Sequence, residues 1–299
     1  MKKRNISFVS VALSAFMMLS TACGSNTSSS VEDDPKLLQT PDYSRYTNAF
    51  ESYAYSGPSN GIWRVDGEEY SAGEDFRTVE RYTEYKEAGF NIYLAQSDIN
   101  IGSGFNATVW EREKVYMDAA HEAGLKIILT DARLQHLSSS TQSLIKENDA
   151  DTSYSFETEA DLIAYVEECV ALYKDHPGFY GVMLGDEPKY DELTAYGQMY
   201  RAIKRVFDEL PGEQFIQYNL LPMVPATGDV AYDARFPDVE GFEGTPEDYA
   251  VACYRKYVCD FVDAMGVDYV QYDHYPMLNS GINTVYIRCL QTVAQIAKE

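Results

Sequence analysis

Residues 122–131 read EAGLKIILTD, and this stretch decides the fold class. Gly124 follows helix-forming residues and marks a helix end, because glycine adopts the left-handed backbone at low cost. The run KIILT that follows is rich in β-branched and aliphatic residues, which favours a buried strand. Residues 87–96, EAGFNIYLAQ, repeat the same order of helix, glycine and strand. The chain is therefore predicted to consist of β/α units.

Short strand patterns alternate with longer helical patterns from about residue 50 onward. The predicted strands are a segment within Tyr53–Trp63 and residues 91–96, 126–131, 179–184, 214–220 and 267–275. The predicted helices are Glu74–Gly89, Thr108–Gly124, Glu157–Lys174, Asp191–Leu210, Pro246–Met265 and Asn283–Lys298. This alternation is typical of a parallel sheet with right-handed helical crossovers.

The loops that follow strands are long, at 97–106, 132–156 and 221–245, whereas the loops that precede strands are short. This asymmetry places the elaborate loops at the carboxyl ends of the strands, which is the functional face of a β/α barrel. The alternative is a doubly wound open sheet, which usually carries a glycine-rich phosphate loop after its first strand. No G-x-G-x-x-G or P-loop pattern occurs. We therefore predict an α/β fold of the (β/α)8 TIM-barrel type.

The number of units raises a difficulty, because a closed barrel of this type has eight and the sequence indicates six. Six units would leave two exposed sheet edges, which favour aggregation. We therefore expect a barrel truncated after the sixth β/α unit. A barrel that is complete with six strands is the alternative.

The N-terminus has the pattern of an export signal. Lys2, Lys3 and Arg4 precede a largely apolar stretch, Ile6–Leu19, which is too short for a comfortable membrane span. LSTAC, residues 19–23, resembles the lipobox of bacterial lipoproteins, although Ser20 stands where leucine is usual. The resemblance implies lipidation of Cys23 and anchoring at the bacterial membrane or cell surface; an ordinary signal peptide is the alternative. We assign 1–22 to the signal, 23–45 to a Ser-rich tether and 46–299 to the incomplete barrel.

Charge and cysteine content narrow the classes of partner. Without the three basic residues of the signal, 21 of the 24 Lys and Arg remain against 47 Asp and Glu, so the net charge goes from −23 to −26. Such a surface repels nucleic acid and anionic lipid. The remaining cysteines, Cys169, Cys253, Cys259 and Cys289, form no C-x-x-C pair. We expect them to be free and buried, with Cys259–Cys289 as the alternative disulfide, and we expect no metal and no cofactor.

Polar and aromatic side chains follow the predicted strands, where a barrel places its active site. Carboxylates and amides bind sugar hydroxyls, and aromatic rings stack on the flat faces of sugars. The 25 tyrosines supply many such rings, and no G-x-S-x-G motif indicates a serine nucleophile. The predicted substrate-binding set is Asp186, Asp131, Arg133, Gln96, Asn219, Asp273, His274, Tyr275 and Trp63.

GDEP, residues 185–188, ends the fourth predicted strand. This motif resembles the Asn-Glu-Pro that ends the fourth strand in the retaining glycoside hydrolase clan of β-galactosidases and cellulases. YDHYP, residues 272–276, resembles the sixth-strand segment of uncharacterised bacterial glycosidase-like barrels. The resemblance implies that Glu187 is the catalytic acid/base, and that the nucleophile ends a seventh strand, outside this chain. Asp186 departs from the pattern, because an ionised aspartate accepts hydrogen bonds and cannot donate one to a sugar hydroxyl.

Each assignment has a structural alternative. The D-E-P motif is also typical of a solvated turn, because Asp and Pro favour turns. Asp131 and Arg133 are placed to form an ion pair with each other, and residues 273–275 are placed to cap a loop.

For the chain as a whole, we predict a glycoside hydrolase-like protein that acts on a neutral extracellular glycan, with a non-catalytic glycan-binding lipoprotein as the alternative. As given, the chain is expected to be inactive because the nucleophile is missing. The oligomeric state is not predicted.

Overall fold

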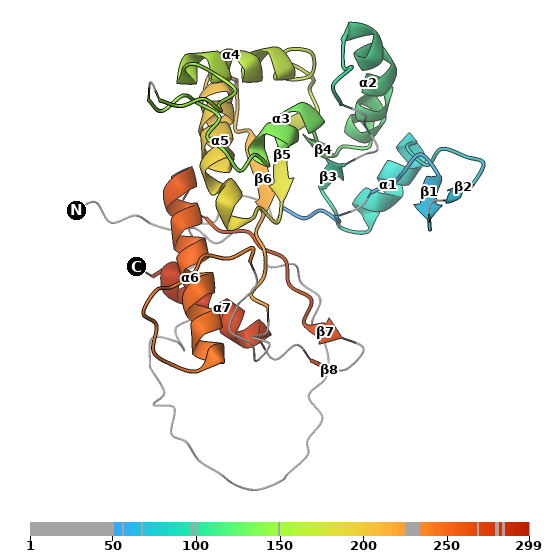
Figure 1. The fold of residues 1–299 in the computed structure, drawn as a ribbon. Coiled ribbons are helices and arrows are strands. Elements are labelled where there is room, and N and C mark those ends of the chain that lie inside the picture. The colour runs from blue at the N-terminus through green and yellow to red at the C-terminus, as the bar shows by residue number, and fades with distance from the viewer. Residues whose placement is uncertain are drawn as a thin grey trace, which may run out of the picture.

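A computed structural model describes residues 51–55, 57–66, 68–96, 99, 101–148, 150–224, 234–267, 269–278, 281–282 and 285–298. At its centre is a four-stranded parallel sheet of β3 (Ile92–Ala95), β4 (Lys126–Leu129), β5 (Phe179–Asp186) and β6 (Phe215–Asn219). The strands lie side by side in the order of the sequence, with helices packed around them (Figure 1). The sheet is confirmed as parallel and barrel-like, because a doubly wound sheet would reverse its strand order.

Two further segments continue the sheet on either side. Ser52 accepts backbone hydrogen bonds through its carbonyl oxygen from Asn91 and Ile92, next to β3. Beyond β6, the Leu220 amide donates to the Gln271 carbonyl at 3.0 Å, and Leu220 forms a parallel bridge with Tyr272. The described residues thus form an arc of a β/α barrel, which confirms the predicted fold class.

The helices that connect these strands begin and end at residues with clear chemical reasons. They are α1 (Val79–Glu87), α2 (Ala107–Glu122), α3 (Ala132–Ser138), α4 (Glu159–Val170), α5 (Leu193–Phe207), α6 (Pro246–Met265) and α7 (Tyr286–Ile296), with a short 3₁₀ helix, η2 (Tyr190–Glu192), before α5. Asn106, Thr158 and Thr245 cap the amino ends of α2, α4 and α6 through their side-chain oxygens. Gly89 and Gly124 follow α1 and α2 with φ angles of 104° and 80°, as the two EAG stretches predict.

The two faces of the sheet bury different side chains. Ile92, Leu94, Ile128 and Met183 form a small apolar cluster on the inner face of the arc, with Tyr53, Tyr180 and Phe215 packed against it. The alternate residues, among them Tyr93, Ile127 and Val182, join the large cluster that the helices cover. This alternation places Gln217 and Asn219 on the same side of β6 as Phe215. Asn219 therefore stands at the inner carboxyl edge of the arc.

Several predicted elements differ from the structure. The segment Tyr53–Trp63 is not one strand, because its second half turns into a hairpin of β1 (Ile62–Val65) and β2 (Glu68–Ser71). Residues 269–275 form only the bridge at Tyr272, and a second small hairpin follows at β7 (Met277–Leu278) and β8 (Gly281–Ile282). The loop predicted at 132–156 begins with α3, because the Asp131 side chain caps that helix by accepting from the Arg133 amide.

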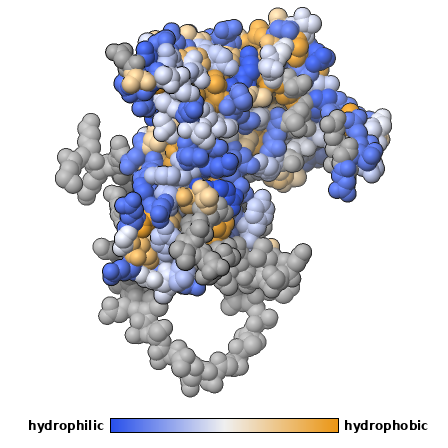
Figure 2. Space-filling model, in the orientation of Figure 1, coloured by the Kyte–Doolittle hydropathy of each residue, from blue (hydrophilic) through white to orange (hydrophobic). Residues whose placement is uncertain are grey.

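The remaining general features concern the surface and the thiols. The described surface in Figure 2 is mainly hydrophilic, with hydrophobic atoms in scattered groups. No helix of the described ranges is long and apolar enough to cross a bilayer. Cys169, Cys253, Cys259 and Cys289 are free, and Cys259 is the one that is only partly buried. Among the described residues, no cluster of His, Cys, Asp and Glu is arranged to hold a metal ion.

Candidate active site

Asp186 is the last residue of β5, and donors from two other parts of the chain hold its carboxylate. The Tyr55 hydroxyl donates to Oδ2 at 2.6 Å, and Asn219 Nδ2 donates to Oδ1 at 2.9 Å. Asn219 is the β6 residue in register with Asp186. The carboxylate is exposed, but both of its oxygens already accept hydrogen bonds from the protein.

Glu187 follows Asp186 in a backbone conformation that glutamate rarely adopts. Its φ angle is 50°, in the left-handed region, which costs a residue with a side chain about 1 kcal/mol or more. Its amide donates to the Asn219 carbonyl at 2.7 Å, and the buried Tyr257 hydroxyl donates to the next carbonyl, that of Pro188, at 2.6 Å. These two bonds hold the strained turn in place. Such strain is concentrated at functional sites in proteins.

Two glycines in β5 allow this arrangement. A Cβ atom on Gly181 would lie 1.8 Å from the Phe215 carbonyl oxygen, so only glycine lets β5 approach β6 this closely. A Cβ atom on Gly185 would lie 2.9 Å from the ring of Tyr196 on α5. Gly185 thus serves close packing of the strand end on α5.

The charges around Glu187 favour its protonated form. Partial burial raises the pKa of Glu187 above 4.5, and the negative charges of Asp273 and Asp186 raise it further. The positive charge of Arg235 lowers the pKa but does not outweigh these effects. A partly buried carboxyl group with a raised pKa keeps its proton to a higher pH and can donate it to a reacting group.

Asp273 is the third carboxyl group of the site. Burial and the charge of Asp186 raise its pKa above 3.8, whereas hydrogen bonding with Tyr275 and Asn219 acts in the opposite direction. Asn219 therefore lies between Asp186 and Asp273 and interacts with both. The structure brings together Asp186, Glu187, Asn219 and Asp273, all four of which the sequence predicted.

The neighbours of Asp273 complete one side of the site. Tyr275 is 69% exposed, and the charge of Asp273 raises its pKa above 10. The His274 ring lies 5.1 Å from the Tyr286 ring between centroids, and burial lowers the pKa of His274 below 6.5. His274 therefore faces an aromatic ring of α7.

The structure describes the side chain of Gln96 but not that of Trp63. Gln96 follows β3 and interacts with the Tyr55 hydroxyl, so it lies at the edge of the carboxylate cluster. Trp63 belongs to β1, and its side chain lies outside the described residues, as does Cys23. Their predicted roles stay predictions.

Asp131 and Arg133 form an ion pair whose two side chains are hydrogen-bonded to each other and to other protein groups. Asp131 is fully buried, and its oxygens accept from the Arg133 amide and Nε at 3.0 Å each and from Nη2 at 2.7 Å. The Tyr173 hydroxyl adds a bond at 3.0 Å, and Arg133 Nη2 also donates to the Cys169 carbonyl at 2.6 Å. These bonds tie α3 to the end of α4, so protein partners alone account for both side chains. The structure therefore supports the alternative in which Asp131 and Arg133 form an ion pair with each other.

Comparisons with known proteins give weak similarities. No family model and no curated protein sequence matches this chain. Cel5A of Thermotoga maritima, solved in complex with mannotriose, is 14% identical over 48% of this chain and 44% of its own length, with a TM-score of 0.31. A GH5-4 broad-specificity endoglucanase from Clostridium longisporum is 12% identical over 74% of this chain and 73% of its own length, with a TM-score of 0.35.

A GH5 xyloglucanase from Bacteroides ovatus, in complex with a XXXG heptasaccharide, is 11% identical over 73% of this chain and 67% of its own length, with a TM-score of 0.28. This chain spans less than half the length of the Thermotoga protein. At these identities and TM-scores, the similarities carry no conclusion about what this chain does.

Sequence reasoning missed Tyr55 and Arg235. Tyr55 lies 131 positions before Asp186, in a segment where the sequence predicts a strand and names only Trp63 as a site residue. Arg235 acts on Glu187 from the long segment after β6, where no periodic pattern marks it. Only the general excess of tyrosine pointed toward residues such as Tyr55.

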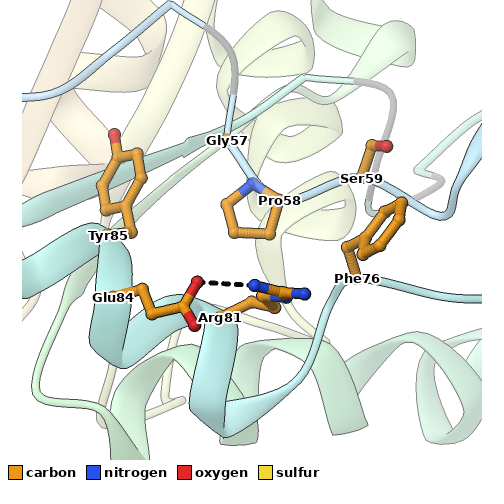
Figure 3. Close-up of a pocket in the computed structure, with 7 residues that line it drawn as sticks. All are labelled: Gly57, Pro58, Ser59, Phe76, Arg81, Glu84 and Tyr85. Atoms are coloured by element: carbon orange, nitrogen blue, oxygen red, sulfur yellow. Dashed lines mark hydrogen bonds and ion pairs between the residues drawn. The ribbon is translucent and has the colours of Figure 1, made fainter.

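A pocket of about 430 Å³ lies next to the Tyr55 segment, but it is separate from the carboxylates. Figure 3 shows Pro58, Phe76 and Tyr85 on its walls and the ion pair of Arg81 with Glu84, 2.8 Å long, across its lower side. Its lining residues are Gly57, Pro58, Ser59, Phe76, Arg81, Glu84 and Tyr85. The pocket is open to solvent, and none of the clustered carboxylates lines it, so we place the chemistry at the end of β5.

Proposed function

We propose that this chain carries a glycosidase-type site in which Glu187 is the general acid/base. The observation that carries the proposal is the setting of Glu187. It stands at the carboxyl end of a central barrel strand, in a strained backbone conformation, with a pKa raised by burial and by two neighbouring carboxylates. These are the conditions for donating a proton to a leaving oxygen.

The substrate is a neutral glycan. Tyr55 and Tyr275, which are 49% and 69% exposed, present aromatic rings beside the carboxylates for stacking on sugar faces. The net charge of −23 disfavours polyanions as substrates. In this proposal the chain is exported and held at the cell surface by a lipid on Cys23, because of the signal-like N-terminus and the LSTAC stretch.

The catalytic proposal is tested by the dependence of hydrolysis on the leaving group. A general acid matters for aryl glycosides with poor leaving groups and hardly at all for those with a dinitrophenyl group, which leaves without a proton. In a form of the protein that hydrolyses glycosides, Glu187→Gln should therefore lower kcat/KM for the poor substrates by about 10²–10⁴-fold and leave kcat/KM for the activated ones nearly unchanged. The value of kcat should fall for both, because the same residue serves as the base of the second step. Glu209→Gln, at an exposed glutamate after α5, is the matched control. Full hydrolysis of poor substrates by Glu187→Gln would refute the assignment.

A non-catalytic glycan-binding role is the second candidate. The exposed Tyr55 and Tyr275 rings favour it, because they would hold a sugar whether or not a bond is cleaved. In that case titration calorimetry with cello- and manno-oligosaccharides should show binding that Glu187→Gln preserves, without any hydrolysis by the unaltered protein. Hydrolysis by the unaltered protein would instead support the enzyme, whereas loss of binding in Tyr275→Ala is expected of both roles.

A further inference from the structure

Tyr55 reaches the catalytic face from a part of the chain that the barrel strands do not contain. Its ring is half exposed, but its hydroxyl is only 2.6 Å from Asp186 Oδ2. A hydrogen bond of this length from a hydroxyl to a carboxylate is short and charge-assisted, and therefore among the stronger kinds. Burial, followed by this bond and the charge of Asp186, raises the pKa of Tyr55 above 10, so Tyr55 stays protonated and remains a donor.

Asn219 holds the same carboxylate from the other side and also holds the backbone of Glu187. Its Nδ2 donates to Asp186 Oδ1 at 2.9 Å, while its carbonyl accepts from the Glu187 amide at 2.7 Å. With one donor on each oxygen, the Asp186 carboxylate cannot rotate without losing a hydrogen bond. An exposed aspartate side chain without these donors would be free to move into solvent.

We propose that Tyr55 is a positioning residue of this site: with Asn219, it fixes the Asp186 carboxylate in one orientation beside Glu187. The negative charge of Asp186 then stays at a constant distance from the Glu187 carboxyl group, because the Asp186 side chain does not turn toward solvent. The consequence for catalysis depends on the proposed function, whereas the clamp itself depends only on the hydrogen bonds described here.

Several other groups also act on Glu187 and must be separated from the clamp. Asp273 contributes negative charge from the segment after α6, and Arg235 contributes positive charge from the segment after β6. Tyr257 of α6 and Tyr275 also interact with Glu187 through its charge. Single substitutions at Tyr55 would therefore be ambiguous, and a double-mutant cycle with Asp186 is needed.

The experiment follows the titration of Glu187 in the full chain labelled with ¹³C at glutamate carboxyl groups, with its signal assigned by its loss in Glu187→Gln. Asp186→Asn removes the charge and should lower the Glu187 midpoint by about one pH unit. Tyr55→Phe removes only the hydroxyl and should lower the midpoint by about half as much, because the carboxylate moves toward solvent. In the Asp186→Asn background, Tyr55→Phe should have no further effect.

Tyr154→Phe is the matched control, because it removes a comparable hydrogen bond, of 2.5 Å to Glu157, away from these carboxylates. It should leave the midpoint of Glu187 unchanged. An unchanged midpoint in Tyr55→Phe, or an equal shift in the Asp186→Asn background, would overturn the positioning role. The titration needs no turnover, so a failed glycosidase assay would reject the proposed function and leave this inference to its own test. If the protein does hydrolyse glycosides, Tyr55→Phe should lower kcat more than it raises KM.

Discussion

Replacing Asp131 by asparagine tests whether the Asp131–Arg133 pair supports the fold or contacts a substrate. Asparagine keeps the shape of the side chain but removes its charge, and its amide nitrogen cannot accept the hydrogen bonds that an aspartate oxygen accepts. The remaining side-chain oxygen can still accept from the Arg133 amide and Nε, but Nη2 would keep only the Cys169 carbonyl among the acceptors described above. Its guanidinium would remain charged with its side chain only 15% exposed.

The magnitude follows from how deeply the pair is buried. Burial acts to lower the pKa of Arg133, but the hydrogen bond and the charge of Asp131 together raise that pKa above its ordinary value. Breaking a buried ion pair from one side costs roughly 3–5 kcal/mol, because it leaves an uncompensated charge. Arg133 retains some solvent contact and the Cys169 bond, so we expect Asp131→Asn to lower the free energy of unfolding by about 3 kcal/mol.

Urea unfolding followed by circular dichroism measures this loss. The matched double variant, Asp131→Asn with Arg133→Met, removes both charges and should recover part of the stability that Asp131→Asn loses, since no buried charge remains. A substrate-binding aspartate would behave differently: its replacement would leave the unfolding curve in place and affect only binding or turnover. An Asp131→Asn protein within about 0.5 kcal/mol of the unaltered chain would refute the structural reading of the pair.

Three further predictions concern β5, its acid residue and a helix cap. Gly181→Ala should cost at least about 3 kcal/mol or prevent soluble expression, because its Cβ would overlap the Phe215 carbonyl, whereas Gly104→Ala, with open space around it, should be tolerated. Glu187 has a raised pKa, so its stabilising contribution is complete below its unfolded pKa of about 4.5 and is lost as pH rises through the folded value. The free energy of unfolding of Glu187→Gln, relative to that of the unaltered protein, should therefore increase as the pH rises from about 4 to 7. The same difference between the two proteins at both pH values would contradict this. Thr245→Ala removes the cap on the Asp248 amide and should cost about 1 kcal/mol in thermal or urea unfolding.

The sequence predicts those parts of the fold that local patterns determine. EAGLKIILTD contains its own helix end and its own strand, and the structure has both within a few residues of the predicted bounds. The helix at Pro246–Met265 matches its prediction at both ends, because Thr245 caps it and Gly266, with φ of 69°, ends it. The segment 267–275 was predicted as a strand from its apolar pattern, but its described residues, 267 and 269–275, form only the bridge at Tyr272. Strand formation depends on partners that periodicity does not reveal.

Those residues of the candidate site that follow predicted strands could be predicted from the sequence, whereas those brought in by contacts between distant parts of the chain could not. Asp186, Glu187, Asn219 and Asp273 follow strand patterns, so the topology of a parallel sheet brings them to one edge. The ion pair of Asp131 with Arg133 was foreseeable as an alternative, because the two opposite charges lie two positions apart after a predicted strand. Nothing local marks Tyr55, whose role depends on a fold that brings it to a residue 131 positions later.

The segment that carries Tyr55 also determines when the site can form during synthesis. Glu51 accepts from Tyr180 at a separation of 129 residues, and the Tyr53 hydroxyl accepts from Gln217 and Gln271 at separations of 164 and 218. Contacts between such distant residues form late, since the closure of long loops must come first. The ribosome therefore releases β3 and β4, which Ser52 and Glu51 contact, well before Tyr180, Gln217 and Gln271 emerge. Until Gln271 has emerged, the Tyr53 hydroxyl lacks one of these two donors, so this end of the arc can be completed only late in synthesis.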